Sequence, residues 1–242
     1  MNLTSNIYRI IVLINGRGFV MALLSELVAT CEAQRLDTGA TLNVFARRLR
    51  EAGRLSKFGR GRGAAHMTFL DAARFLIACA ATDHPERAAD AEFVFSNLLR
   101  HGDVGSDADF PMAKEDFPTL ETALAKTLEQ LADGTIDAVA SARWKEQFPD
   151  GPHMPHAFVW LIVRRSGQAE LRVLDGRYQY HHPALVAVVG SIESGGYPVQ
   201  KVAEEALDRE THRFRTGKNL TAELQGDLLR AVAKLIATGK KG

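Results

Sequence analysis

The chain has 242 residues, of which 46% are hydrophobic and 24% are charged, and its 30 Lys and Arg residues nearly balance its 29 Asp and Glu residues. This is the composition of an ordinary folded protein. It excludes a wholly disordered chain, a collagen-like chain and a small disulfide scaffold. The length fits one large domain or two modest ones.

The beginning of the chain contains one short apolar run, residues 7–14, which Arg9 interrupts. A membrane span needs about 20 apolar residues, and a signal peptide needs a basic start and a small-residue cleavage site. The sequence therefore predicts no membrane association. Either the run is a buried strand, or Met21 rather than Met1 is the natural start and residues 1–20 are an upstream extension. The clean helical pattern from Met21 favours the second alternative.

The two cysteines, Cys31 and Cys79, lie among apolar neighbours in helix-like stretches. They are too few for a disulfide framework, and the chain contains no CxxC pair. We expect both to be small buried core residues of a cytoplasmic protein.

Apolar residues at helical spacing predict several helices in the first part of the chain. These helices cover residues 21–34, 41–52, 69–81 and 85–101. Gly53 is expected to end the second helix, because glycine tolerates the left-handed conformation. Thr68, followed by Asp71, is expected to cap the third. The third helix is almost wholly apolar, so we expect it at the centre of a core.

The second part of the chain changes in character after a break rich in Gly, Asp and Pro over residues 102–118. Residues 157–163 and 170–174 read as a β-hairpin with its turn at Gly167. The other expected elements are a helix over 120–131, a short third strand over 177–180, an apolar run of undecided type over 183–192, and helices over 199–213 and 221–237.

The predicted fold is a mostly helical α+β protein. An N-terminal helical domain that resembles a helix–turn–helix unit covers residues 1–102. An acidic linker and helix cover residues 103–156. A β-hairpin or small antiparallel sheet flanked by helices covers residues 157–242.

The charges are strongly segregated along the chain. Residues 41–63 contain seven Lys and Arg residues and a single acid, Glu51, which gives a local net charge of +6. Residues 102–150 contain eleven acids and four bases, a net charge of −7. The basic segment is a credible electrostatic footprint for phosphate groups.

The placement of the basic residues favours duplex DNA as the partner. Two short helices joined by a tight turn, the second with an arginine face, are the arrangement that helix–turn–helix units bring to the major groove. Arginine pairs with guanine or phosphate in bidentate fashion, and the GRGRG stretch keeps the backbone thin enough to follow DNA. The expected contacts with the duplex are Arg47, Arg48, Arg50 and Arg54, with Lys57, Arg60 and Arg62 on phosphates.

A resemblance points the same way. The run LNVFARRLREAGRLSKFGRGRGAAHMTFLDAARFLIA, residues 42–78, resembles the N-terminal part of uncharacterised phage- and prophage-type proteins of bacteria. It is similar, more loosely, to helix–turn–helix regulators. The resemblance implies a DNA-related role in phage or transcription regulation, and no particular residues beyond the basic ones.

No decisive catalytic motif is present, so we expect neither an enzyme nor a cofactor. Four histidines, His153, His156, His181 and His182, are weak candidates for a zinc site if the hairpin brings them together. No HExxH pattern occurs, and adjacent His181 and His182 point opposite ways in an extended segment. We expect ordinary polar histidines and no metal.

The aromatic residues leave an alternative open. Trp160 lies in an apolar strand and is expected in the core, whereas Tyr178 and Tyr180 share one face beside Arg177. That face can stack on bases or serve homo-oligomerisation, in which case the strand edge pairs with a copy of itself. In the alternative function the basic segment is solvated or pairs with the acidic segment. The protein is then a non-enzymatic factor, a phage assembly or inhibitor protein, that binds another protein.

Overall fold

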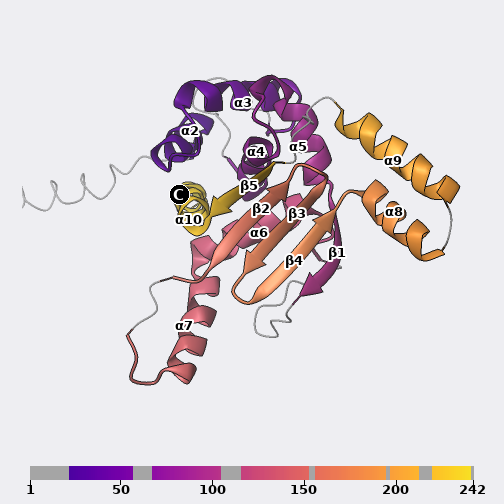
Figure 1. Cartoon of the computed structure of the whole chain (residues 1–242). Coiled ribbons are helices and arrows are strands. Elements are labelled where there is room, and N and C mark those ends of the chain that lie inside the picture. The colour runs from indigo at the N-terminus through magenta and orange to yellow at the C-terminus, as the bar shows by residue number, and fades with distance from the viewer. Residues whose placement is uncertain are drawn as a thin grey trace, which may run out of the picture.

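The computed structural model describes residues 22–56, 67–104, 116–152, 156–194, 197–212 and 220–240. It is a mostly helical α+β protein, as the sequence predicts, with a five-stranded antiparallel sheet in the described part of the chain (Figure 1). One hydrophobic cluster contains buried residues from Ala22 to Ile236. Helices and sheet therefore share a core.

The first helices form around the apolar positions that predict them. Helix α2 (Leu24–Ala33) is followed by a short turn and by α3 (Gly39–Glu51), whose N-terminus is capped by the hydroxyl of Thr38. Gly53 follows α3 with φ 69°, as expected. Helix α4 (Phe69–Ala81) is buried along most of its length and packs against α3, α5 (Ala88–Ser96) and α6 (Leu120–Asp133), which confirms its central place.

The next predicted helix is correct only in its first part. A 3-10 turn (Pro85–Arg87) leads into α5 (Ala88–Ser96), and strand β1 (Leu99–Val104) then begins where the prediction continues the helix to residue 101. Backbone pairing with a distant segment explains this difference: Leu99 and Arg100 lie opposite residues of strand β4 (Gly176–His181). Helical spacing within one segment contains no information about such a partner.

The hairpin is confirmed and is larger than predicted. Strands β2 (Val159–Arg164), β3 (Gln168–Val173) and β4 (Gly176–His181) form a meander whose first turn contains Gly167 at φ 94°. The sheet order is β1-β4-β3-β2-β5. The hairpin edge expected to be free for self-association is therefore covered, because β1 pairs with β4.

The last predicted helix begins too early. Residues Thr221–Gln225 are strand β5, which pairs with β2, and helix α10 is Gly226–Lys240. Within β5, Leu224 is buried while its neighbours Glu223 and Gln225 are exposed. This alternation is that of a strand with one covered face.

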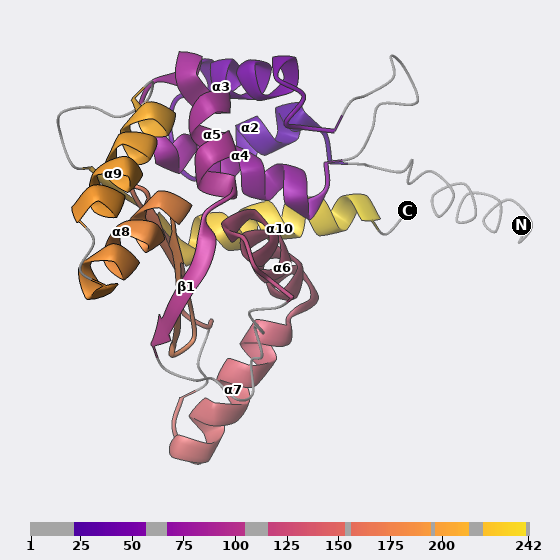
Figure 2. The same cartoon turned by 90° about the vertical axis from the view of Figure 1, so that its right-hand side faces the viewer.

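Among the described residues, the helices that pack against the sheet lie on one of its faces. Helix α6 (Leu120–Asp133), which confirms the predicted helix over 120–131, packs against α4 and α10. Figure 1 shows α6 behind the strands, and Figure 2 shows α6 and α10 to one side of them. The opposite face, called here the open sheet face, faces the viewer in Figure 1.

Three further helices lie outside this central layer. Helix α7 (Thr135–Gln147), which the sequence pattern does not predict, projects away from the rest of the molecule (Figure 2). The apolar run of undecided type is helix α8 (Pro183–Ser194), and it packs against α9 (Tyr197–Thr211). Among the described residues, none of the helices has both the length and the apolar character needed to cross a bilayer.

Candidate nucleic-acid interface

Helix α3 separates an apolar face from an arginine face. Leu42, Phe45, Ala46 and Leu49 are buried, whereas Arg47 and Arg50 are exposed. Helix α2 packs against α3 through a tight turn. The structure thus contains the two successive helices and the short turn that the sequence predicts, and Arg47 and Arg50 of the second helix face solvent.

Acidic side chains hold part of this basic face. Arg48 donates from Nε to Glu86 Oε2 at 2.6 Å and from Nη1 to Glu51 Oε2 at 3.1 Å. The hydrogen bonds to Glu86 and then to Glu51 raise the pKa of Arg48. Arg47 lies 3.9 Å from Glu51 and 4.0 Å from Glu86. All four side chains are well exposed, and exposed ion pairs of this kind are weak.

Arg50 differs from its neighbours. It lies on the exposed side of α3, and none of the ion pairs found among the described residues includes it. Within the described structure, its guanidinium is therefore open to an anion.

Arg54 belongs to a buried ion-pair network instead. Its guanidinium binds the carboxylate of Glu92, whose side chain is 0% exposed, with Nη2 to Oε1 at 3.0 Å. Ser96 donates its hydroxyl to the same carboxylate at 2.5 Å, and Arg74 binds Glu121 at 2.8 Å beside it. The hydrogen bond to Glu92 raises the pKa of Arg54. This side chain joins α5 to the end of α3, so its role in the described structure is internal.

The remaining predicted contacts, Lys57, Arg60 and Arg62, lie in the segment 57–66, outside the described residues. A buried residue lies close to each end of that segment. Leu55 and Met67 are 2% and 3% exposed, and Met67 N donates to Ala22 O at 3.1 Å.

Asp71 ties the two ends together. Its Oδ1 accepts a hydrogen bond from Ser56 N at 2.8 Å, and its Oδ2 accepts one from Thr68 N at 2.9 Å. The Thr68 hydroxyl in turn accepts a bond from Asp71 N, which completes the predicted cap of α4. Asp71 is 2% exposed. The TxxD pattern in the sequence predicts the cap, whereas the hydrogen bond from Ser56 to Asp71 becomes visible only in the tertiary structure.

The histidines do not form a metal site in the described parts of the chain. No group of three or more His, Cys, Asp or Glu side chains there is arranged to hold a metal ion. His153 lies outside the described residues. His182 is buried and bonds Glu210 at 3.0 Å, whereas adjacent His181 lies on the open sheet face, 5.2 Å from the ring of His101.

The environment of His181 favours its neutral form. Its pKa is lowered from the ordinary value of 6.5, first by desolvation and then by the charges of His101 and Arg164. The two cysteines lie in the core region, as predicted: Cys31 is buried, and Cys79 packs against the core. Burial raises the pKa of Cys31 to about 12 and that of Cys79 well above its ordinary value.

The aromatic residues of the sheet lie opposite to their predicted sides. Tyr178 and Tyr180 are 5% and 0% exposed and belong to the core. Trp160 is only half-buried, because Val159 and Leu161 occupy the covered face and Trp160 alternates with them. In the pattern Arg-Tyr-Gln-Tyr-His, the alternation of polar and aromatic residues indicates that the two tyrosines share the buried face. The run around Trp160 is uniformly apolar, so it does not indicate which face is buried.

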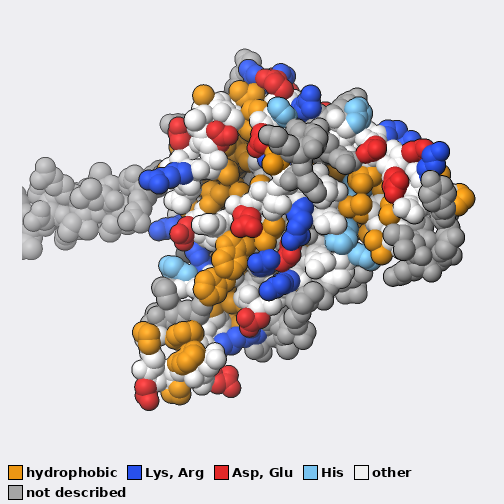
Figure 3. All heavy atoms as spheres, viewed as in Figure 1, with side chains coloured by type: hydrophobic (Ala, Val, Ile, Leu, Met, Phe, Trp, Pro, Cys, Tyr) orange, Lys and Arg blue, Asp and Glu red, His pale blue; other side chains and the backbone are white. Residues whose placement is uncertain are grey.

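Trp160 therefore stands on the open sheet face together with Phe158. Their rings stack with centroids 5.4 Å apart and an angle of 11° between the planes. Figure 3 shows a hydrophobic patch on this side of the molecule, next to Lys and Arg side chains over the sheet.

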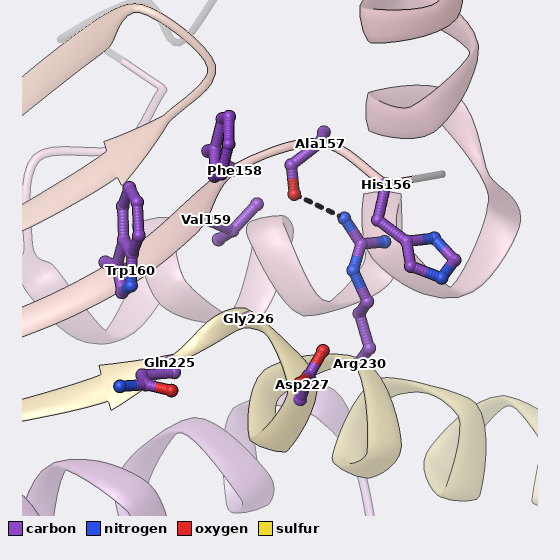
Figure 4. Close-up of a pocket in the computed structure, with 9 residues that line it drawn as sticks. All are labelled: His156, Ala157, Phe158, Val159, Trp160, Gln225, Gly226, Asp227 and Arg230. Carbon is purple, nitrogen blue, oxygen red and sulfur yellow. Dashed lines mark hydrogen bonds between the residues drawn. The ribbon is translucent and has the colours of Figure 1, made fainter. Parts of the chain in front are cut away.

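A cavity of about 230 Å³ opens beside the two rings (Figure 4). Its polar lining includes His156, Gln225, Asp227 and Arg230. Arg230 donates from Nη2 to Ala157 O at 2.7 Å and from Nη1 to Asp137 Oδ2 at 2.6 Å. Arg230 thus fixes the chain at the entrance to β2 and shapes the cavity.

Comparison of the chain with known protein families, with curated proteins and with solved structures found no match.

Proposed function

We propose that the protein is a DNA-binding regulatory protein of the phage type that contacts duplex DNA through α3 and the segment 57–66. The observation that supports this most directly is the clamp at Asp71, which accepts hydrogen bonds from both ends of the Arg-rich segment. The clamp brings together Ser56 and Thr68, which flank that segment, and Ser56 follows within five residues of α3, the helix that exposes Arg47 and Arg50.

The structure narrows the set of contacts that we propose. Arg47 and Arg50 would face the duplex, with Lys57, Arg60 and Arg62 on phosphates. Arg54 is left out, because withdrawing it would strand the buried carboxylate of Glu92. Arg48 would first have to release Glu86, an exchange between exposed partners that costs little.

The test measures the affinity for a labelled duplex at increasing salt concentrations, with fluorescence anisotropy as the readout. We expect a steep loss of affinity with salt, since each phosphate contact contributes about 0.9 to the log–log slope. Arg47→Ala/Arg50→Ala should weaken binding and reduce the slope by about 2. Lys201→Ala/Arg209→Ala removes the same charge from exposed positions of α9 and should change neither. Unchanged affinity of the α3 variant, with the control equally unaffected, would refute the proposal.

A second candidate function is supported by the ion pairs themselves. Arg48 forms hydrogen bonds with Glu86 and Glu51, as expected if the charges of this surface are paired within the protein itself. In that case the protein is a non-enzymatic factor that binds another protein. The same titration separates the two functions: no duplex binding even at the lowest salt concentration would favour the second.

A further inference from the structure

The open sheet face presents a row of side chains that crosses four strands. Trp160 on β2 lies opposite Gln225 on β5 and opposite Arg172 on β3, and Arg172 lies opposite Arg177 on β4. Neighbouring strands are about 4.8 Å apart. The indole and the two guanidinium groups therefore start from backbone positions within about 10 Å of one another.

The two aromatic rings at one end of this row form a flat stacking surface. Phe158 is 58% exposed and lies nearly parallel to Trp160. Exposing an aromatic pair forgoes the stabilisation that its burial would give. An exposed aromatic ring such as that of Phe158 is suited to stack on a further flat π-system, and every nucleobase provides one.

The arginines beside the rings are positioned by a buried acid. The side chain of Glu170 is 6% exposed; its Oε1 accepts a hydrogen bond from Arg172 Nε at 2.5 Å, and its Oε2 one from Arg164 Nη2 at 3.5 Å. The side chain of Arg172 is still 33% exposed. Its terminal amino groups remain available to an anion within the described structure.

Arg177 extends the positive charge to the next strand. It is exposed, and no ion pair among the described residues includes it. Glu223, an exposed acid of strand β5, belongs to a different row, opposite Ile162. Rings followed by guanidinium groups thus match a ligand that alternates bases with phosphates.

The cavity of Figure 4 adds polar groups at the ring end. The amide of Gln225 and the carboxylate of Asp227 line it together with Phe158 and Trp160. An amide supplies donors and an acceptor, and a carboxylate supplies acceptors, which are the groups that read the edge of an unpaired base. The bases of a duplex are stacked on each other, so their faces are not accessible to such a surface.

We propose that the open sheet face binds single-stranded nucleic acid, with bases stacked on Phe158 and Trp160 and phosphates held by Arg172 and Arg177. This site is separate from α3 and does not rest on duplex binding. Single-stranded DNA and RNA share the chemistry that the surface recognises, and the experiment distinguishes them.

The reporter is the fluorescence of Trp160 itself. The chain contains two tryptophans, so Trp144→Phe leaves Trp160 as the single emitter. Titration of this variant with a dodecamer of thymidine and with a dodecamer of uridine should quench the emission. A preference for either dodecamer shows whether the surface binds single-stranded DNA or RNA. An unlabelled duplex of equal length should compete at least tenfold less well.

Variants of the surface then test the assignment. Phe158→Ala should weaken binding about 5- to 100-fold, the loss expected for one stacked base. Arg172→Ala/Arg177→Ala should weaken it and flatten its salt dependence. Phe158 and Arg177 are exposed, and unchanged circular dichroism would confirm that these variants fold.

Control variants separate this proposal from the duplex proposal. Arg47→Ala/Arg50→Ala should leave the quenching unchanged even if it abolishes duplex binding. Absence of quenching by both dodecamers would overturn the inference. So would binding that Phe158→Ala leaves unchanged, or binding that the α3 variant abolishes.

Discussion

The ion pair between Arg54 and Glu92 offers the sharpest test of how the basic segment is used. The change is Arg54→Met, which keeps an apolar stem but removes the charge. Glu92 is 0% exposed on its side chain, and Arg54 is 21% exposed. Removing the arginine leaves a buried carboxylate without its main partner.

The magnitude follows from what remains around that carboxylate. Breaking a buried ion pair costs about 3–5 kcal/mol. Arg74 Nε still lies 3.9 Å from Glu92, and the Ser96 hydroxyl still donates to it at 2.5 Å. We therefore expect a cost at the low end of this range, a loss of about 3 kcal/mol in the free energy of unfolding. For a chain of this size that corresponds to a fall in Tm of about 6–12 °C.

The assay is urea unfolding followed by circular dichroism, with calorimetry for Tm. Arg50→Met is the matched control, because the same chemical change is made at an exposed position of α3. It should cost less than about 0.5 kcal/mol. The double change Arg54→Met/Glu92→Gln should lose less than the sum of its parts, by about 0.5–3 kcal/mol. Equal costs at positions 50 and 54, or strict additivity in the double variant, would refute the internal role of Arg54.

Other features of the structure give further expectations. Asp71→Asn should lower the free energy of unfolding by about 2 kcal/mol, because charge-assisted hydrogen bonds are lost, and should weaken duplex binding with every arginine intact; unchanged affinity would contradict its clamping role. Gly167→Ala should destabilise the β2–β3 turn by about 1–3 kcal/mol, since the residue has φ 94°; an equally stable variant in urea unfolding would contradict this. The thiols of Cys31 and Cys79 should react with a thiol reagent only on unfolding, because burial raises the pKa of both; rapid labelling of the native protein would contradict it. The pKa of His181 is lower in the folded chain than its ordinary 6.5, so the unfolded chain binds more protons around that pH and stability falls as the pH drops below it. His181→Gln should lose less stability between pH 7 and pH 5, as measured by Tm; an unchanged pH profile would contradict the assignment.

Local patterns were sufficient for much of the helical part. The apolar spacing in α3 and α4, the cap at Thr68 and the end at Gly53 are all visible in the sequence. These features depend on contacts between residues that are close together in the chain, so the local sequence is sufficient to predict them.

Strand pairing lay beyond those patterns. β1 and β5 are strands because each finds a partner far away in the chain, at β4 and β2. The local pattern assigns residues 99–101 and 221–225 of these strands to helices instead. Only the assembled sheet supplies the backbone hydrogen bonds that make the extended conformation the more stable one.

The sequence by itself determined the mostly helical α+β class, the hairpin and a basic segment at residues 41–63. The tertiary structure decided which of the basic side chains point outwards. It placed Arg54 on buried Glu92 and left Arg50 exposed, and it turned Trp160 outwards and the tyrosines inwards. The physical reason is common to these cases: whether a side chain is free depends on which distant element covers its face, and no local periodicity specifies that element.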